Sequence, residues 1–350
     1  FLEYFIVSEG QMWVKILYIL SQKVKEGVEV RLMYDGTNEF TNLPHNYPAM
    51  LEKLGIACRI FDPVRPFVST EYNYRDHRKI TVIDGKTAYT GGLNLADEYI
   101  NATHPYGHWK DVAIRSYGDG VATFTRLFLE SWNYQANKPM PEENRYIEAS
   151  ALYGLLRTEG DRIVEDGFVI PYADNPLDGE RMGEQVYLDI LQTASDYVYI
   201  MTPYLILDET MVNALTYAAK RGIDVRIILP HIPDKRYAFA LAKTHYRELL
   251  EAGVKIYEYT PGFVHAKVFV SDDRRATVGS INLDYRSLYH HFEVGLYVDG
   301  NRVIGDILED FQKTLDKCQQ ISLEDTRTGG FRNRFDRALG AVFKLLAPML

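Results

Sequence analysis

Cysteine is nearly absent from this sequence of 350 residues. The two cysteines, Cys58 and Cys318, lie in unrelated contexts, which fits neither a disulfide framework nor a zinc site and favours a reducing compartment. No apolar run approaches the length of about 18 residues that a membrane span needs, and no signal peptide opens the sequence. Because residue 1 is Phe in a strand-like run, we expect that an amino-terminal part of the natural protein is missing here, and that part could include membrane spans.

An excess of basic residues is also lacking. The net charge is −9, whereas a nucleic-acid backbone is normally met by a basic protein surface. The charge therefore argues against a nucleic-acid partner. The composition is otherwise that of a soluble globular protein, with 46% hydrophobic and 25% charged residues, and the chain length predicts two domains or two fused lobes.

One sequence pattern occurs twice. It reads His, any residue, Lys, four residues, Asp, six residues, Gly, two residues and Asn. The first copy consists of His77, Lys79, Asp84, Gly91 and Asn94, and the second of His265, Lys267, Asp272, Gly279 and Asn282. Average residue usage makes a chance match of five fixed positions very rare. The pattern therefore indicates an internal duplication.

The elements around the two copies repeat in the same order. Strand-like runs alternate with segments of helical apolar spacing, which are 11–25, 48–54, 209–220 and 243–251. This alternation predicts an α/β fold with two similar lobes, each a mixed, mainly parallel sheet flanked by helices, related by pseudo-twofold symmetry. The expected domains are residues 1–150, residues 151–326 and a basic amphipathic tail, 327–350.

Each copy of the pattern places a histidine beside a lysine, because residues two apart on a strand point to the same face. Related lobes commonly associate about an approximate twofold axis, which would bring both strands to one interface. We therefore expect one pocket that contains His77, Lys79, His265 and Lys267.

Asn94 and Asn282 follow the hairpins beside small residues that allow a ligand close to the backbone. Gly92 stands where the second copy has Ser280, so a hydroxyl contact to the substrate is expected from one lobe only. Lysine charge and amide donors suit the non-bridging oxygens of a phosphate diester. One neutral histidine can attack phosphorus while the other, protonated, gives its proton to the leaving alcohol.

Four acidic residues are candidates for supporting the histidines. Asp84 and Asp272 lie at the predicted hairpin turns, where turn formation or a supporting ion pair is favoured over direct chemistry. Asp111 and Glu293 each begin an apolar, strand-like run, and an acid at such a position can hold the tautomer of a catalytic histidine.

A metal site is the alternative interpretation of the remaining histidines. It would use His290 and His291 with Glu293, or His104 with His108. Neither spacing fits a zinc motif. We therefore expect neither a metal nor another cofactor.

The duplicated pattern closely resembles that of the phospholipase D superfamily over nearly all of residues 1–316. Within it, segments such as HRKITVIDGKTAYTGGLNLADEY, TPYLILDETM and GFVHAKVFVSD are most similar to bacterial cardiolipin synthases. The resemblance implies transfer through a phosphohistidine without an obligatory metal. It implies these roles: His77 as nucleophile with His265 as the second catalytic histidine, Lys79, Lys267, Asn94 and Asn282 as phosphate ligands, and Asp111 and Glu293 as histidine-orienting acids.

The implied reaction moves a phosphatidyl group from one phosphatidylglycerol to another, releases glycerol and gives cardiolipin. A phospholipase D-type hydrolase is the nearest alternative, and a nucleic-acid phosphodiesterase is less favoured. The resemblance also implies a bacterial membrane location, with the catalytic lobes at the cytoplasmic face and membrane segments before this chain. The basic stretch Phe331 to Leu350 would lie on the membrane surface or, equally, pack on its own domain.

Overall fold

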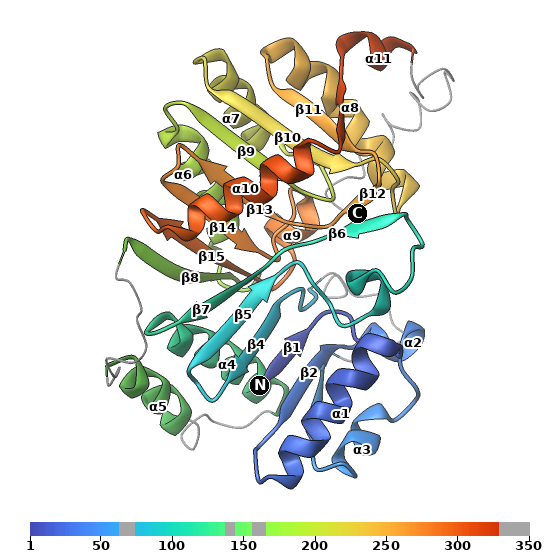
Figure 1. Cartoon of the computed structure of the whole chain (residues 1–350), viewed down its shortest axis with the longest axis vertical. Coiled ribbons are helices and arrows are strands. Elements are labelled where there is room, and N and C mark those ends of the chain that lie inside the picture. The colour runs from blue at the N-terminus through green and yellow to red at the C-terminus, as the bar shows by residue number, and fades with distance from the viewer. Residues whose placement is uncertain (63–73, 137–143, 156–165, 329–350) are drawn as a thin grey trace.

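The computed structural model describes residues 1–62, 74–136, 144–155 and 166–328. Figure 1 shows two sheet-containing lobes, one from the first half of the chain and one from the second. The first lobe comprises β1 (Leu2–Tyr4), α1 (Gln11–Lys25), β2 (Arg31–Asp35), α2 (Asn38–Thr41), α3 (Tyr47–Glu52), β3 (Ala57–Phe61), β4 (Lys79–Ile83), β5 (Thr87–Gly91), a 3-10 turn (Asp97–Ile100), β6 (His108–Lys110), β7 (Ala113–Tyr117), α4 (Gly120–Ala136) and α5 (Asn144–Leu155).

The second lobe repeats this succession of elements. It comprises β8 (Phe168–Asp174), α6 (Met182–Thr193), β9 (Tyr197–Met201), α7 (Glu209–Lys220), β10 (Asp224–Pro230), α8 (Arg236–Ala252), β11 (Lys255–Tyr259), β12 (Gly262–Val264), β13 (Val268–Ser271), β14 (Arg275–Gly279), α9 (Tyr285–Tyr289), β15 (Glu293–Asp299), α10 (Val303–Leu315), β16 (Cys318–Ile321) and α11 (Leu323–Thr328).

The two sheets share one strand order. The first is β3-β2-β1-β4-β5-β7, and the second contains β11-β10-β9-β13-β14-β15 with β16 and β8 added at its edges. The predicted α/β fold of two similar lobes is thereby confirmed. The two sheets differ from the prediction of mainly parallel strands. Within them, β3, β2 and β1 run parallel to one another, as do β11, β10 and β9, and the other neighbouring strands are antiparallel. Each repeated pattern forms a hairpin, and a tight turn joins only antiparallel strands.

Local sequence explains most element boundaries. The helix predicted over 11–25 is α1, and that over 209–220 is α7, whose first turn is capped by the carboxylate of Asp208 through the Met211 amide at 2.8 Å. Helix α8 begins before the predicted residue 243, because Ala238 and Leu241 extend its buried stripe. In the first hairpin, Asp84 and Gly85 adopt the left-handed angles, φ 54° and 62°, that a two-residue turn requires.

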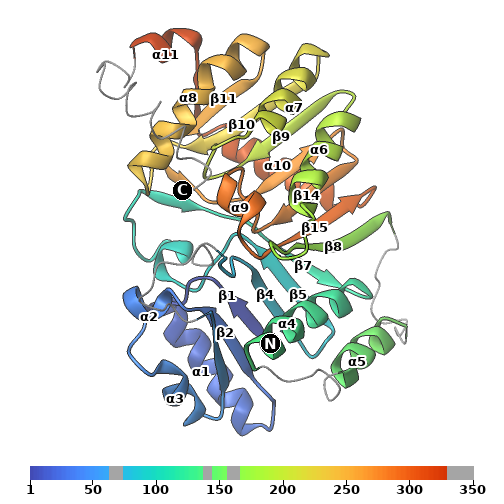
Figure 2. The same ribbon diagram turned by 180° about the vertical axis from the view of Figure 1, so that it is seen from behind.

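The lobes are joined by a common apolar core. Helices α1 and α3 cover the outer face of the first sheet, and α6, α7 and α8 cover the outer face of the second. Between the sheets, β4 and β5 share one buried cluster with β13, β14 and β15, to which α4 and α10 also contribute. Figure 2, the view from behind, shows α4 lying against the face of the first sheet that is opposite to α1 and α3. Burial of this shared surface fixes the lobes relative to each other.

The predicted domain boundary can be compared with the structure, whereas most of the predicted tail cannot. The boundary between residues 150 and 151 falls inside α5, and the division into domains stays a prediction. The tail proposed for Phe331 to Leu350 lies outside the described residues. In the part of the chain that the structure describes, no helix has both the length and the apolar character needed to cross a bilayer.

Candidate active site

The two repeated hairpins meet through reciprocal backbone contacts. The His77 amide donates a hydrogen bond to the carbonyl of Phe292 at 2.9 Å, and the His265 amide donates to the carbonyl of Lys110 at 2.7 Å. Phe292 and Lys110 each precede the acid predicted to orient a histidine, and β6 also pairs with β12 across the lobes. Two equivalent contacts in opposite directions are the mark of a twofold arrangement.

Each histidine of the repeated pattern is held by the acid of the other lobe. His77 Nδ1 lies 2.9 Å from Glu293 Oε1, and His265 Nδ1 lies 2.7 Å from Asp111 Oδ2. All four side chains are almost completely buried, since their side-chain exposures are 8%, 0%, 9% and 2% respectively. Because Nδ1 of each imidazole is engaged, Nε2 is the nitrogen that can react. The sequence indicated both acids but not this exchange between lobes.

The two lysines occupy equivalent positions beneath the histidines. Lys79 donates a hydrogen bond from Nζ to the carbonyl of its own His77, and Lys267 does the same to His265. Both side chains are buried, and the charge of Lys267 is among the causes that lower the pKa of Lys79. The expected set of two histidines and two lysines is therefore brought together in one buried cluster, since the other three groups all act on the His77 imidazole.

The two asparagines are placed alike but bonded differently. Asn94 accepts a hydrogen bond from the Ile6 amide at 3.0 Å and donates one to the Tyr99 hydroxyl at 2.7 Å. Asn282 is also buried, yet its Oδ1 has no hydrogen-bond partner among the described residues. Both follow the second strand of their hairpin, and their role as phosphate ligands stays a prediction.

The hydroxyl of Ser280 supports one of the two acids. Its Oγ donates a hydrogen bond to Glu293, and the residue is fully buried. Gly92, the equivalent in the first lobe, leaves no room for a side chain, because a Cβ there would lie 2.1 Å from Asp111 Oδ1. The expected contact of Ser280 with the substrate phosphate stays a prediction.

The small residues of the pattern have a different cause from the one expected. A Cβ at Gly91 would lie 2.2 Å from the carbonyl oxygen of Val112, and one at Gly279 would lie 2.4 Å from that of Val294. The close approach observed is that of the neighbouring segment of each sheet. These segments include Glu293 at the start of β15 and Asp111 in the link between β6 and β7.

The aspartates of the pattern lie at the far ends of the hairpins. Asp84 is exposed at the turn after β4, roughly 17 Å along an extended strand from Lys79. Asp272 accepts hydrogen bonds from the backbone amides of Ser195, Asp196 and Tyr197 at 2.7, 3.0 and 2.9 Å. Both positions suit the structural role that the turn pattern favoured, and neither carboxylate contacts a histidine.

Several residues of the site carry no signal in the repeated pattern. Ser287 donates a hydrogen bond to Glu293 Oε1 at 2.6 Å, and the ring of His291 lies 5.3 Å from that of His77. Aromatic rings line the two histidines: Phe5 stands edge-on to His77 at 5.0 Å, and Tyr99 to His265 at 5.4 Å. The one available clue was proximity in sequence, since Ser287 and His291 lie close to Glu293.

Burial gives the lysines unusually low pKa values. Desolvation is the largest cause that lowers the pKa of Lys79 from 10.5 to about 7. The charge of the other lysine is the next cause that acts in the same direction. Desolvation likewise lowers the pKa of Lys267 to about 8, although Asp111 and Glu293 oppose the shift. An anion bound beside these two lysines would therefore favour their charged forms.

The two histidine–acid pairs differ in their electrostatics. Burial raises the pKa of Glu293 well above its usual range, and burial together with Lys79 holds the pKa of His77 well below 6.5. Burial and the Lys267 charge lower the pKa of His265 to about 4, despite the opposing effect of Asp111. Burial acts to raise the pKa of Asp111, but the charge of His265 and its hydrogen bond outweigh it and leave that pKa lowered. Asp111 is thus the more firmly ionised of the two acids.

One group of possible metal ligands overlaps the site. In the described part of the chain, potential ligand atoms of His77, His291 and Glu293 lie within 4.8 Å of one another. The neighbouring Lys79 disfavours a cation at that point, because like charges repel in a buried site. Of the other histidines considered, His104 and His108 are exposed. The expectation of chemistry without a metal stays a prediction.

Comparison with known proteins gives a consistent result. The family model described as "Cardiolipin synthase, PLD-like domain" matches residues 4–106 and 187–315. An uncharacterised protein of Streptococcus mutans is 54% identical over 350 residues, which cover 100% of this chain and 73% of that protein. A cardiolipin synthase of Halalkalibacterium halodurans is 36% identical over 352 residues, covering 100% of this chain and 67% of the relative.

A solved structure shares the fold. The phosphatidylserine synthase of Haemophilus influenzae Rd KW20 has a TM-score of 0.71 and 16% sequence identity, covering 99% of this chain and 87% of that one. Fold and site together define an enzyme of the phospholipase D superfamily, in the phosphatidyltransferase class. The chain belongs to the cardiolipin synthase family of phospholipase D-like domains.

Proposed function

We propose that this enzyme is a cardiolipin synthase that transfers a phosphatidyl group between two molecules of phosphatidylglycerol through a phosphohistidine. The observation that carries the proposal is the buried pair of histidines, each held at Nδ1 by a carboxylate and each beside a lysine. Family membership supports a phospholipid substrate over a nucleic acid. The bacterial membrane is the proposed location, because the lipid substrates are there.

In the first half-reaction His77 Nε2 attacks phosphorus of the donor lipid, opposite the glycerol oxygen. The N–P bond forms as the P–O bond to glycerol breaks, and His265 Nε2 gives its proton to the departing oxygen. Lys79 and Lys267 bind the non-bridging oxygens, where negative charge must be stabilised. Asn282 is the further proposed ligand, through its amide Nδ2–H group, because Asn94 Nδ2 already donates to the Tyr99 hydroxyl.

In the second half-reaction a hydroxyl of another phosphatidylglycerol attacks the phosphohistidine. His265, now neutral, accepts the hydroxyl proton, the new O–P bond forms, and the N–P bond to His77 breaks. This step returns His77 to its neutral form and His265 to its protonated form. The products of one cycle are cardiolipin and glycerol.

The electrostatics support His77 as the nucleophile. Burial and the Lys79 charge keep its pKa low, so the imidazole stays neutral and retains a lone pair on Nε2. His265 is paired with the more firmly ionised Asp111, which favours its protonated form once an anionic phosphate offsets the charge of Lys267. The acid role therefore suits His265.

Product analysis tests the proposal. Purified enzyme with phosphatidylglycerol alone should yield cardiolipin and glycerol in equal amounts. The His77→Ala variant should yield neither, while His265→Ala should accumulate little phosphoenzyme because glycerol lacks a proton donor. Phosphatidic acid as the main product would identify a hydrolase instead, and cardiolipin formation by His77→Ala would refute the assigned nucleophile.

A further inference from the structure

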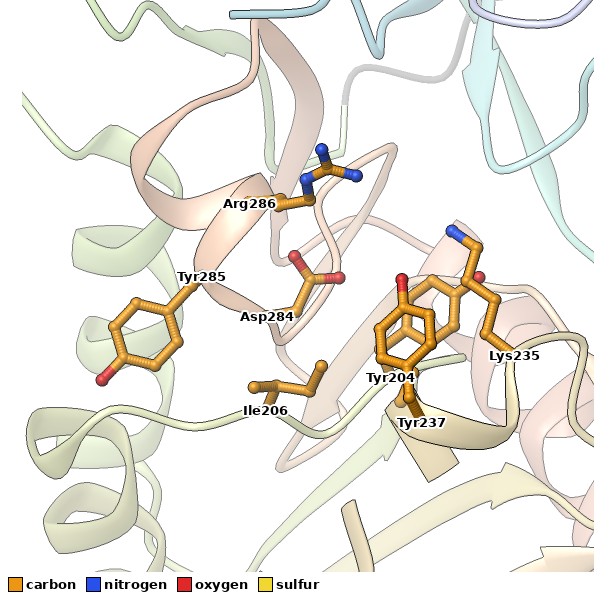
Figure 3. Close-up of a pocket in the computed structure, with 8 residues that line it drawn as sticks. Tyr204, Ile206, Lys235, Tyr237, Asp284, Tyr285 and Arg286 are labelled. Atoms are coloured by element: carbon orange, nitrogen blue, oxygen red, sulfur yellow. The ribbon is translucent and has the colours of Figure 1, made fainter. Parts of the chain in front are cut away.

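A pocket lies beside the proposed catalytic residues and is not used in the steps above. It encloses about 330 Å³ of space, including its opening. Its walls come from three segments: Tyr204 and Ile206 after β9, Lys235 and Tyr237 at the start of α8, and Asp284 to Arg286 at the start of α9. Figure 3 shows the side chains of Lys235 and Arg286 ending on the same side of this pocket.

The pocket is connected to the catalytic centre through one short segment. Asp284 follows the motif residue Asn282 by two positions, and Arg286 directly precedes Ser287, whose hydroxyl donates to Glu293 at 2.6 Å. The ring of His291, 5.3 Å from that of His77, is acted on by both cations of the pocket: after burial, the charges of Arg286 and Lys235 are among those that lower its pKa.

Two acids lie at the pocket, Asp284 in its wall and Asp234 beside it, and both accept hydrogen bonds from neutral donors. The charges of Lys235 and Arg286 also act on Asp284. Asp284 accepts the Ser287 amide at 2.8 Å, which caps α9, and Asp234 accepts the Tyr204 hydroxyl at 2.5 Å. Lys235 is exposed, with its Nζ 5.4 Å from the centre of the Tyr204 ring. Two cations beside aromatic and hydroxyl groups suit a polar anion that also carries an alkyl portion.

We propose that this pocket binds the phosphoglycerol headgroup of the acceptor phosphatidylglycerol, with Lys235 and Arg286 holding its phosphate. The inference rests on the proposed function. Only the acceptor brings a second phosphate into the site, because the donor phosphate lies at the histidines and the donor headgroup is neutral glycerol. In the acceptor, the attacking oxygen and the phosphorus are five bonds apart, roughly 6 Å when extended.

This arrangement explains how a lipid could outcompete other alcohols. The phosphate anchored at Lys235 would direct the terminal hydroxyl of the headgroup toward His77, where it attacks as described above. Neutral alcohols and water carry no anionic group that the two cations can bind. The pocket would therefore select the acceptor and leave the bond-making step to the histidines.

A partition experiment tests the proposal. The enzyme is given phosphatidylglycerol vesicles and a fixed concentration of ethanol, and cardiolipin and phosphatidylethanol are measured together. Both arise from the same phosphohistidine, so their ratio reports acceptor choice independently of total activity. For Lys235→Ala the ratio should fall about 10-fold, the usual effect of losing one charge-assisted contact, and Lys235→Arg should restore most of it.

The matched control is Lys220→Ala, which removes another exposed lysine, at the end of α7. Its ratio should equal that of the unmodified enzyme. An unchanged ratio in Lys235→Ala, or an equal fall in both variants, would overturn the proposal, the latter because it would reflect general attraction to anionic vesicles. Absence of cardiolipin with the unmodified enzyme would instead refute the proposed function.

Soluble competitors identify the source of the phosphate. Glycerol 3-phosphate has the same spacing between hydroxyl and phosphate as the lipid headgroup, and it should inhibit cardiolipin formation less in Lys235→Ala than in the unmodified enzyme. Inorganic phosphate should compete more weakly, because it lacks the glycerol portion. Equal competition by inorganic phosphate would assign the pocket to a free anion and contradict a headgroup site.

Discussion

Binding of an anion in the catalytic pocket should draw protons from solution. The pKa of Lys79 is about 7 and that of Lys267 about 8 in the empty site. At about pH 8, roughly a tenth of Lys79 and half of Lys267 is therefore protonated. A bound anion favours the charged form of both. If it restores them fully, about 0.9 proton is taken up at Lys79 and about 0.5 at Lys267, or roughly 1.4 per anion.

Calorimetry measures this uptake directly. Sulfate is a suitable probe because it does not titrate near neutral pH, and the dependence of the binding enthalpy on the ionisation enthalpy of the buffer gives the number of protons. Uptake at the two lysines should fall to about 0.1 at about pH 6, where both are already charged, so any larger uptake at that pH belongs to the histidines. Affinity should accordingly weaken as the pH rises through 7 and 8.

Two variants distinguish proton uptake by the buried lysines from proton uptake at the protein surface. Lys79→Gln should reduce the uptake at about pH 8 to about 0.5 or less, since only Lys267 then titrates. Lys86→Gln, which removes an exposed lysine at the turn of the first hairpin, should leave it unchanged. Sulfate binding without proton uptake at about pH 8 would refute the argument that burial holds these lysines partly neutral.

The remaining predictions concern the residues around the two acids. Hydroxyl donors favour the ionised form of Glu293, so Ser280→Ala and Ser287→Ala should each raise its pKa and move the acidic limb of the pH–rate profile to higher pH; an unshifted limb would contradict this role. Gly92→Ser should displace Asp111 and reduce cardiolipin formation by about 100-fold or more, because no space for a Cβ exists there. Activity near that of the unmodified enzyme, with unaltered circular dichroism, would show that the strand can shift.

Much of the fold followed from periodicity and repetition. The helices at 11–25 and 209–220 carry one-sided apolar spacing that a single segment contains in full. Periodicity and repetition did not predict whether neighbouring strands run parallel or antiparallel, because this depends on where each hairpin inserts in its sheet. Alternating strands and helices suggested parallel sheets, whereas the hairpin strands β4 and β13 run antiparallel to β1 and β9.

The sequence predicted which residues make up the candidate site but not which acid contacts which histidine. A fixed spacing identified His77 and His265, and strand geometry explained why each lies beside a lysine. The partner of each histidine depends on the packing of one lobe against the other, which no spacing within a lobe encodes. Ser280 shows the same limit, because a small polar residue beside a motif fits a ligand contact as well as a contact to Glu293.

The exchange of acids makes the two lobes a single catalytic unit. If each histidine used an acid of its own lobe, one lobe could retain an oriented imidazole without the other. Here separation of the lobes would remove Glu293 from His77 and Asp111 from His265 at once, and would expose the core shared by β4, β5, β13 and β14. The apolar surface between the sheets therefore holds the histidines in position as directly as their own hydrogen bonds do. Duplication supplied two copies of the pattern, and the interface between the copies supplies the orientation that chemistry at phosphorus requires.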